Sequence, residues 1–325
     1  MDKLNFFKRA CLVLFIFLII TNSFWLWRTF HVSQENEAKI KEYNSQLEQF
    51  ELISPEIAWL DVNSFLEKQG TYSLDYSKLK ESLLNQTKIS SGGKYGIYFQ
   101  DLDTGLSIGI NEKEKFFPQS LFKVPLMVVV LRKIQNGELA LDTTIYLSKA
   151  DLDSESGSLF KKGAGYPITI KELLEIMVKE SDNTAAKALA NRFLDESNYL
   201  EVTSIMGLPP PQNGVITVSP KEYSNLFRSL YYSNYLRRPF SEIALSMMAE
   251  TDFKEQLSAG LPGTVKISHK FGANEESGYY HDCGIIYLEE KNYLLCVMSS
   301  GNTKEQADSV ISNISKIVYE YVLEN

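Results

Sequence analysis

Ser120 and Lys123, three residues apart, are the first pair in this chain that could do chemistry. They stand in the run Phe-Pro-Gln-Ser-Leu-Phe-Lys-Val-Pro, where a long apolar helix is predicted to begin. Residues i and i+3 share one face of a helix, so the lysine amine can reach the serine hydroxyl. A serine needs an adjacent base to become a nucleophile, and a buried lysine near another cation can serve as that base. The pair therefore predicts nucleophilic catalysis, with free backbone N–H groups at the helix start for an oxyanion.

Two further motifs follow this pair along the chain. By itself, Ser-x-x-Lys also fits a capping serine and a solvated lysine, so the later motifs decide how it is interpreted. One lies between predicted helices at 169–179 and 185–193, and the other lies on a predicted strand that carries an inward cation and a glycine permitting close backbone approach. They are Ser181-Asp182-Asn183 and Lys270-Phe271-Gly272.

The three motifs, in this order and in these contexts, resemble S-x-x-K, S-D-N and K-T-G of the serine β-lactamase and penicillin-binding protein superfamily, most closely its class A β-lactamase branch. The resemblance covers about residues 75–325. It implies an α/β, β-lactamase/transpeptidase-like fold, in which helices flank an antiparallel sheet and a helical subdomain spans about 116–250. The active site is then the groove between these two parts.

The resemblance also assigns roles to single residues. Ser120 attacks a carbonyl, Lys123 accepts its proton, and Ser181 relays a proton to the leaving nitrogen. Substrate binding falls to Asn183, Lys270, Phe271, Gly272 and Ala273. Asn183 holds Lys123 and the substrate amide, while Lys270 binds a substrate carboxylate and lowers the pKa of Lys123. The backbone N–H groups of Ser120 and Ala273 form the oxyanion hole. No metal and no organic cofactor is implied.

Two departures from the family pattern affect the expected chemistry. Phe271 stands where the family has a threonine or serine whose hydroxyl helps to hold the substrate carboxylate. Class A enzymes also carry a loop glutamate that activates the deacylating water, ahead of a helix start that we match to residues 217–220. The corresponding segment here, 208–216, contains no carboxylate. Unless Glu196, Glu201 or Glu276 takes that place, the acyl-enzyme is expected to accumulate.

These features predict a membrane-anchored extracytoplasmic serine hydrolase, acylated at Ser120 by β-lactams or cell-wall peptides, with slow β-lactam turnover and a role in the antibiotic response. Two alternatives remain open: a D-alanyl-D-alanine carboxypeptidase, and a non-catalytic module that binds peptidoglycan or penicillin. A net charge of −8 over 325 residues offers no basic surplus for phosphates and argues against nucleic-acid binding.

The N-terminus predicts a single-pass anchor. Residues 10–27 hold no charge and are long enough to span a bilayer as a helix. Lys3, Lys8 and Arg9 precede the run, which puts residues 1–9 in the cytoplasm. We expect 28–74 to be a stalk or linker and 75–325 to be the hydrolase domain outside a bacterial cell membrane. A cleaved signal peptide is the alternative, although no small-residue cleavage site is visible.

We expect the sheet to contain a hairpin over 95–110 and strands near 264–273, 282–288 and 293–299. A final helix over 303–323 packs on this sheet. Neighbouring residues of a strand face opposite ways, so His281 and Asp282 are not expected to form a triad with a serine. A turn centred on residues 290–291 puts Cys283 opposite Met298 and Cys296 opposite Ile285, so no disulfide is expected between the cysteines.

Overall fold

The computed structural model describes residues 27, 51–54, 76–89, 93–205, 207–208, 215–289 and 291–325. The predicted tail (1–9) and nearly all of the predicted anchor (10–27) and stalk (28–74) lie outside these ranges. Within them, no helix has both the length and the apolar character needed to cross a membrane. The chain divides into two compact units, Met1–Glu51 and Leu52–Asn325, and all three sequence motifs fall in the second.

The main sheet of the second unit confirms the predicted hairpin and three later strands. Its order is β2-β1-β7-β6-β5, and every neighbouring pair runs antiparallel. The strands are β1 (Lys94–Asp101), β2 (Ser107–Ile110), β5 (Lys266–Asn274), β6 (Tyr279–Tyr287) and β7 (Tyr293–Ser300). Strand β5, which carries the third motif, is therefore an outer strand whose free edge is available to neighbouring elements and ligands.

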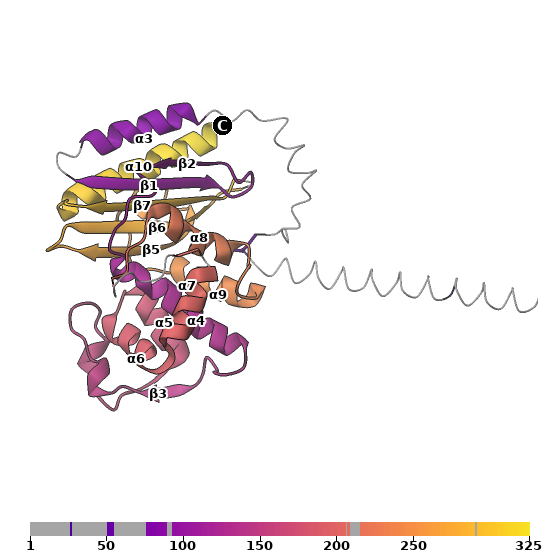
Figure 1. The fold of residues 1–325 in the computed structure, drawn as a ribbon, viewed down its shortest axis with the longest axis vertical. Coiled ribbons are helices and arrows are strands. Elements are labelled where there is room, and N and C mark those ends of the chain that lie inside the picture. The colour runs from indigo at the N-terminus through magenta and orange to yellow at the C-terminus, as the bar shows by residue number, and fades with distance from the viewer. Residues whose placement is uncertain are drawn as a thin grey trace, which may run out of the picture. The chain divides into compact units, whose positions relative to one another are not determined.

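One face of the sheet is covered by α3 (Ser77–Ile89) and α10 (Lys304–Glu324), as predicted for the last helix (Figure 1). Helix α10 begins with a capping box at Thr303. Its buried apolar residues recur at helical spacing and meet the strand residues that point to this face. This core includes Leu79, Leu83, Ile97, Phe99, Leu295, Val297, Ile311, Ile314 and Val318.

The opposite face packs against the predicted helical subdomain (Figure 1). Its helices are α4 (Lys123–Gln135), α5 (Ile170–Lys179), α6 (Asn183–Phe193), α7 (Glu196–Ile205), α8 (Pro220–Tyr231) and α9 (Arg238–Ala249). Helices α8 and α9 contact the sheet directly, while α4 is buried from its first residue to Leu131. A small second sheet, not predicted, pairs β3 (Thr144–Tyr146) with β4 (Pro167–Thr169).

Local sequence determines where the helices around the motifs begin. Asp182 caps α6 by accepting a hydrogen bond from the Ala185 N–H, so the second motif forms the start of that helix. Ser219 caps α8 in a reciprocal box with Glu222, and Pro220 takes the first helical position. Capping therefore holds the Ser-Asp-Asn motif at the start of α6.

The expectation for the cysteines was wrong. In the β6–β7 register Cys283 lies directly opposite Cys296, and the two form a disulfide with an S–S distance of 2.07 Å. The register also pairs Ile286 with Tyr293, so the turn is centred one residue earlier than we expected. Alternation along a strand defines its faces but does not locate the centre of the following turn.

Candidate active site

The side chain of Lys123 lies at the centre of the site. Its Nζ is 3.0 Å from Ser120 Oγ, 3.1 Å from Ser181 Oγ and 2.8 Å from Asn183 Oδ1. It also donates to the Ser181 carbonyl at 2.5 Å. The lysine is fully buried. The structure thus brings the first two motifs together as the sequence predicts, with the amine in position to exchange a proton with the Ser120 hydroxyl.

Lys270 connects the third motif to the same hydroxyl group. Its Nζ is 3.0 Å from Ser181 Oγ and 3.0 Å from the carbonyl oxygen of Phe271. Only 1% of Lys270 is exposed. Ser181 Oγ therefore contacts both lysine amines and can pass a proton between Lys123 and Lys270.

Burial controls the charge of both lysines. It lowers the pKa of Lys123 to about 8, while the negative charges of Asp182 and Asp153 act in the opposite direction. Burial also lowers the pKa of Lys270 well below its ordinary value, and the charge of Lys123 lowers it further. A lysine with a pKa near 8 is partly neutral at physiological pH, as a general base for Ser120 must be.

Ser120 lies in a 3-10 turn, η1 (Gln119–Phe122), that leads directly into α4. We expected Ser120 in the first turn of the α-helix, but that helix begins only at Lys123. Gln119 has a φ of 49°, in the left-handed region that non-glycine residues rarely occupy. The turn is held by a 2.8 Å hydrogen bond from the Tyr223 hydroxyl to the Leu121 carbonyl.

Gly272 allows β5 to approach this turn closely. A Cβ atom at Gly272 would lie 3.0 Å from the Pro118 carbonyl oxygen and 3.1 Å from the Ser120 backbone nitrogen. A larger residue would push the strand away from the nucleophile, so the glycine fits the close-approach interpretation of the sequence. Ala273 follows on the same strand and is exposed, so its backbone is accessible at the edge of the site.

Two aspartates, Asp153 and Asp182, orient the second motif. The sequence did not predict this role for either of them. Asp182 is buried and accepts a hydrogen bond from the Leu159 N–H at 2.8 Å, besides capping α6. Asp153 Oδ1 accepts from the Asn183 amide at 3.2 Å, which turns the Asn183 oxygen toward Lys123. Asp182 carried the signal of an N-cap, but nothing in the sequence pointed to Asp153.

His281 and Asp282 do not act together, as predicted. His281 Nε2 donates to the Phe117 carbonyl at 2.8 Å, and its Nδ1 accepts from the Ser299 N–H at 3.2 Å. Asp282 lies on the other face and pairs with His269 Nδ1 at 2.8 Å. His281 is therefore a neutral imidazole that ties the segment before Ser120 to the sheet.

No carboxylate hydrogen-bonds to Ser120 or Lys123 among the residues that the structure describes. Glu201 instead accepts from the Tyr235 hydroxyl at 3.1 Å, and Glu196 and Glu276 are exposed without such a contact. Most of 208–216 lies outside the described residues. A cavity of about 20 Å³, room for one water, adjoins the Ser120 turn and is mostly apolar. It is lined by Pro118, Phe122, Pro125, Tyr199, Leu208, Ile216, Thr217, Val218 and Tyr223.

Comparison with known proteins agrees with this geometry. A model of the Beta-lactamase enzyme family matches residues 77–322. Beta-lactamase 3 of Bacillus cereus is 26% identical over 245 residues, which cover 70% of this chain and 76% of that protein. A Beta-lactamase of Streptomyces albus G is 24% identical over 256 residues, covering 71% of this chain and 81% of the relative.

Solved structures show the same fold. A protein named PBP-A superposes with a TM-score of 0.71 at 21% identity, covering 77% of this chain and 97% of its own. An ancestral class A Beta-lactamase superposes with a TM-score of 0.68 at 24% identity, covering 74% and 99%. The arrangement of antiparallel sheet and helices is therefore that of β-lactamases and transpeptidases, as expected.

His281 predicts a pH dependence of stability. Burial lowers its pKa from 6.5 to about 4, so between these pH values the unfolded chain binds a proton that the native chain does not. Stability contributed by neutral His281 is then complete above pH 6.5 and is lost as pH falls toward 4, by about 3 kcal/mol. Urea unfolding at pH 7, 5.5 and 4 should show this loss in the wild type and a shallower loss in His281→Asn. Equal pH slopes in the two proteins would contradict the assignment.

Proposed function

The chain belongs to the Beta-lactamase enzyme family and is a serine hydrolase of that acyl-enzyme type, and on this premise we propose that Ser120 is acylated by β-lactams or by cell-wall peptides. The observation that carries the proposal is the 3.0 Å contact between Ser120 Oγ and the Nζ of buried Lys123. A nucleophile and a base in contact, with the base oriented by further groups, is the arrangement that covalent catalysis needs.

In the proposed acylation, neutral Lys123 removes the Ser120 proton while Ser120 Oγ bonds to the carbonyl carbon. Backbone N–H groups of Ser120 and Ala273 stabilise the developing oxyanion. As the C–N bond breaks, the Ser181 hydroxyl gives its proton to the leaving nitrogen. The Lys123 ammonium, 3.1 Å from Ser181 Oγ, then returns a proton to Ser181. Asn183 holds Lys123 throughout through its 2.8 Å contact.

Release of the acyl group is the weak step in this proposal. Hydrolysis needs a base at the attacking water, and such a base typically contributes about 10² to 10⁴-fold. The cavity that adjoins the Ser120 turn is lined by proline, phenylalanine, tyrosine, threonine and aliphatic side chains, and by no carboxylate among the described residues. Lys123 would have to serve both half-reactions, so we propose that β-lactam turnover is slow.

A D-alanyl-D-alanine carboxypeptidase is the second candidate. It is supported by the fold likeness to PBP-A, of which a mutant was solved as an acyl-enzyme complex with penicillin G. The same Ser120 chemistry would act there on a peptide, and penicillin would be a trapped analogue. A module that binds peptidoglycan or penicillin without chemistry is the third candidate, distinguished by the absence of any covalent adduct.

We also propose that residues 10–27 anchor the chain in the bacterial cell membrane, with the hydrolase domain outside. The support is the uncharged run preceded by basic residues. The Cys283–Cys296 disulfide adds support, because structural disulfides persist mainly in oxidising compartments. The substrates named above are extracytoplasmic as well.

Ser120→Ala should abolish covalent labelling by penicillin G, and Lys123→Ala should slow it by orders of magnitude, since nucleophile and base act as a unit. Intact mass after timed incubation measures both effects. Lys133→Ala, which removes a partly exposed lysine from the same helix, is the matched control and should label like the wild type. One equivalent of adduct on Ser120→Ala would show that the nucleophile is another residue.

A chromogenic cephalosporin should give a burst of about one equivalent of product, followed by a slow steady rate, because acylation outruns deacylation. Rapid-mixing absorbance measures the two phases, and mass spectrometry of the quenched mixture should find most of the enzyme acylated. Many fast turnovers without a burst would refute slow deacylation and indicate an efficient β-lactamase.

The proposed topology predicts that protease added to intact spheroplasts digests the hydrolase domain, because that domain lies outside the membrane. Antibody against the domain, compared before and after lysis, follows the digestion. A cytoplasmic marker protein is the control and must stay intact until lysis. A protected domain, or a mature N-terminus near residue 28, would be incompatible with an uncleaved anchor.

A further inference from the structure

Lys270, the cation of the third motif, is not presented to an incoming substrate. Its Nζ lies 4.2 Å from the centroid of the Phe271 ring and hydrogen-bonds to the Phe271 carbonyl and to Ser181. With 1% of the residue exposed, the amine contacts this ring and these two oxygens and has almost no access to solvent. A carboxylate that displaced the ring to reach this cation would break a contact that itself attracts the cation.

Phe271 packs against a second aromatic residue, Phe253. Its ring stacks on that of Phe253, with centroids 3.8 Å apart and planes within 11° of parallel. Both residues are partly exposed. We call Phe253 and Phe271 the aromatic pair. The pair presents apolar surface beside the site, because the Phe271 ring lies 4.2 Å from Lys270 Nζ, which in turn contacts Ser181 Oγ.

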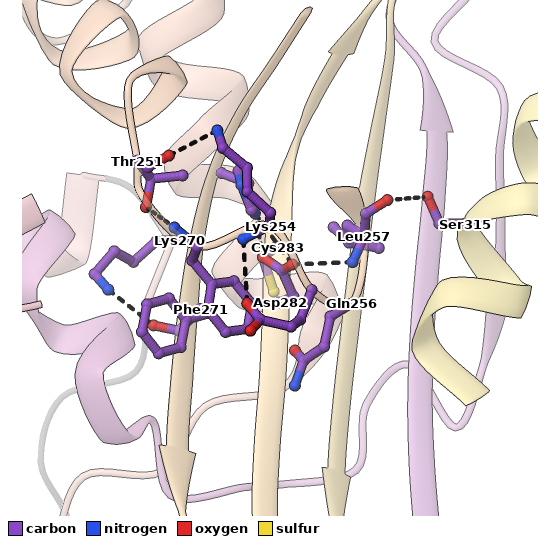
Figure 2. Close-up of polar contacts among 12 residues, drawn as sticks. Thr251, Lys254, Gln256, Leu257, Lys270, Phe271, Asp282, Cys283 and Ser315 are labelled. Atoms are coloured by element: carbon purple, nitrogen blue, oxygen red, sulfur yellow. Dashed lines mark hydrogen bonds and ion pairs between the residues drawn. The ribbon is translucent and has the colours of Figure 1, made fainter. Parts of the chain in front are cut away.

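The segment that carries Phe253 is fastened at both ends, and Figure 2 shows the contacts at the Leu257 end. Thr251 Oγ1 donates to the Lys179 carbonyl at 3.1 Å, before Phe253. After it, the Leu257 N–H donates to Asp282 Oδ2 at 3.1 Å, and Ser315 Oγ donates to the Leu257 carbonyl at 2.7 Å. These contacts to α5, β6 and α10 give the stack a fixed position against the free edge of β5.

The lysine on this segment, Lys254, is also directed away from the aromatic pair. Lys254 is exposed, but its Nζ donates to the Thr251 carbonyl at 2.8 Å, and Figure 2 shows its side chain reaching to Thr251 rather than to Phe271. At this edge of the site the surface offered to a ligand is therefore aromatic, although two lysines lie close by.

We propose that the aromatic pair determines substrate specificity, so that the enzyme favours acyl donors carrying an uncharged, apolar or aromatic group where they meet this edge of β5. Apolar and aromatic groups gain contact area on the rings. A carboxylate placed there loses hydration without gaining an accessible cation. This inference rests on the proposed acylation of Ser120 and names the class of substrate for that reaction.

Penicillin G and its methyl ester provide the test, because they differ only by methylation of one carboxyl group, which removes its charge. The readout is the ratio of their second-order acylation rate constants, acid over ester, from intact mass. In the wild type this ratio should lie below one, because the aromatic pair favours the uncharged ester. In Phe271→Thr, which uncovers Lys270, it should rise by about tenfold, the effect of one added ion-assisted hydrogen bond.

Phe253→Leu leaves β5 unchanged and removes the stack, so the ratio should rise in the same direction but less; this variant decides the matter if Phe271→Thr fails to fold. Phe160→Thr is the matched control, since Phe160 is also a partly exposed phenylalanine beside a lysine amine, and it should keep the wild-type ratio. Circular dichroism checks folding of each protein.

A wild-type ratio above one, or no rise in either pair variant, overturns the specificity role while leaving acylation of Ser120 intact. A wild-type preference for the acid that disappears in Lys254→Gln also overturns it, and assigns carboxylate binding to Lys254. If neither compound acylates Ser120 in any protein, the proposed function fails first and this inference falls with it.

Discussion

Two lysine amines within hydrogen-bond distance of one serine hydroxyl, both buried, are the interaction on which the rest of this structure depends. Like charges in a water-poor site repel strongly, and burial penalises each charge separately. The protein offsets these costs with oxygen acceptors rather than with ion pairs in direct contact: the Ser181 carbonyl, Asn183 Oδ1 and the Phe271 carbonyl. The remaining cost lowers the pKa of both lysines, and that lowered pKa makes Lys123 usable as a base.

The surrounding fold holds these groups in contact. Three backbone segments meet at the site: the turn before α4, the start of α6 and the edge strand β5. Gly272 permits the strand to touch the turn, and His281 ties the segment before the turn to the sheet through its two ring nitrogens. Asp182 and Asp153 hold the start of α6. Each of these residues acts through another, so each is a positioning residue.

Family membership and specificity depend on different residues here. The residues that resemble the family, Ser120, Lys123, Ser181 and Asn183, are the ones that meet around the amine of Lys123. The departure, Phe271, lies at the edge of the same site and is stabilised by Phe253 from a different segment. The shared fold therefore supports the type of reaction, while the aromatic pair bears on which acyl donors fit, as expected when function depends on a site carried by a common fold.

The sequence by itself determined the parts that local rules govern. Ser-x-x-Lys spacing placed the amine beside the hydroxyl, the predicted helices on either side of Ser-Asp-Asn located that motif near a helix start, and strand alternation put His281 and Asp282 on opposite faces. Only the tertiary structure decided the pairing of Cys283 with Cys296, the contact of Asp153 with Asn183 and the stacking of Phe253 on Phe271. Those depend on turn centres and on packing between segments far apart in the chain, and local periodicity carries no information about either.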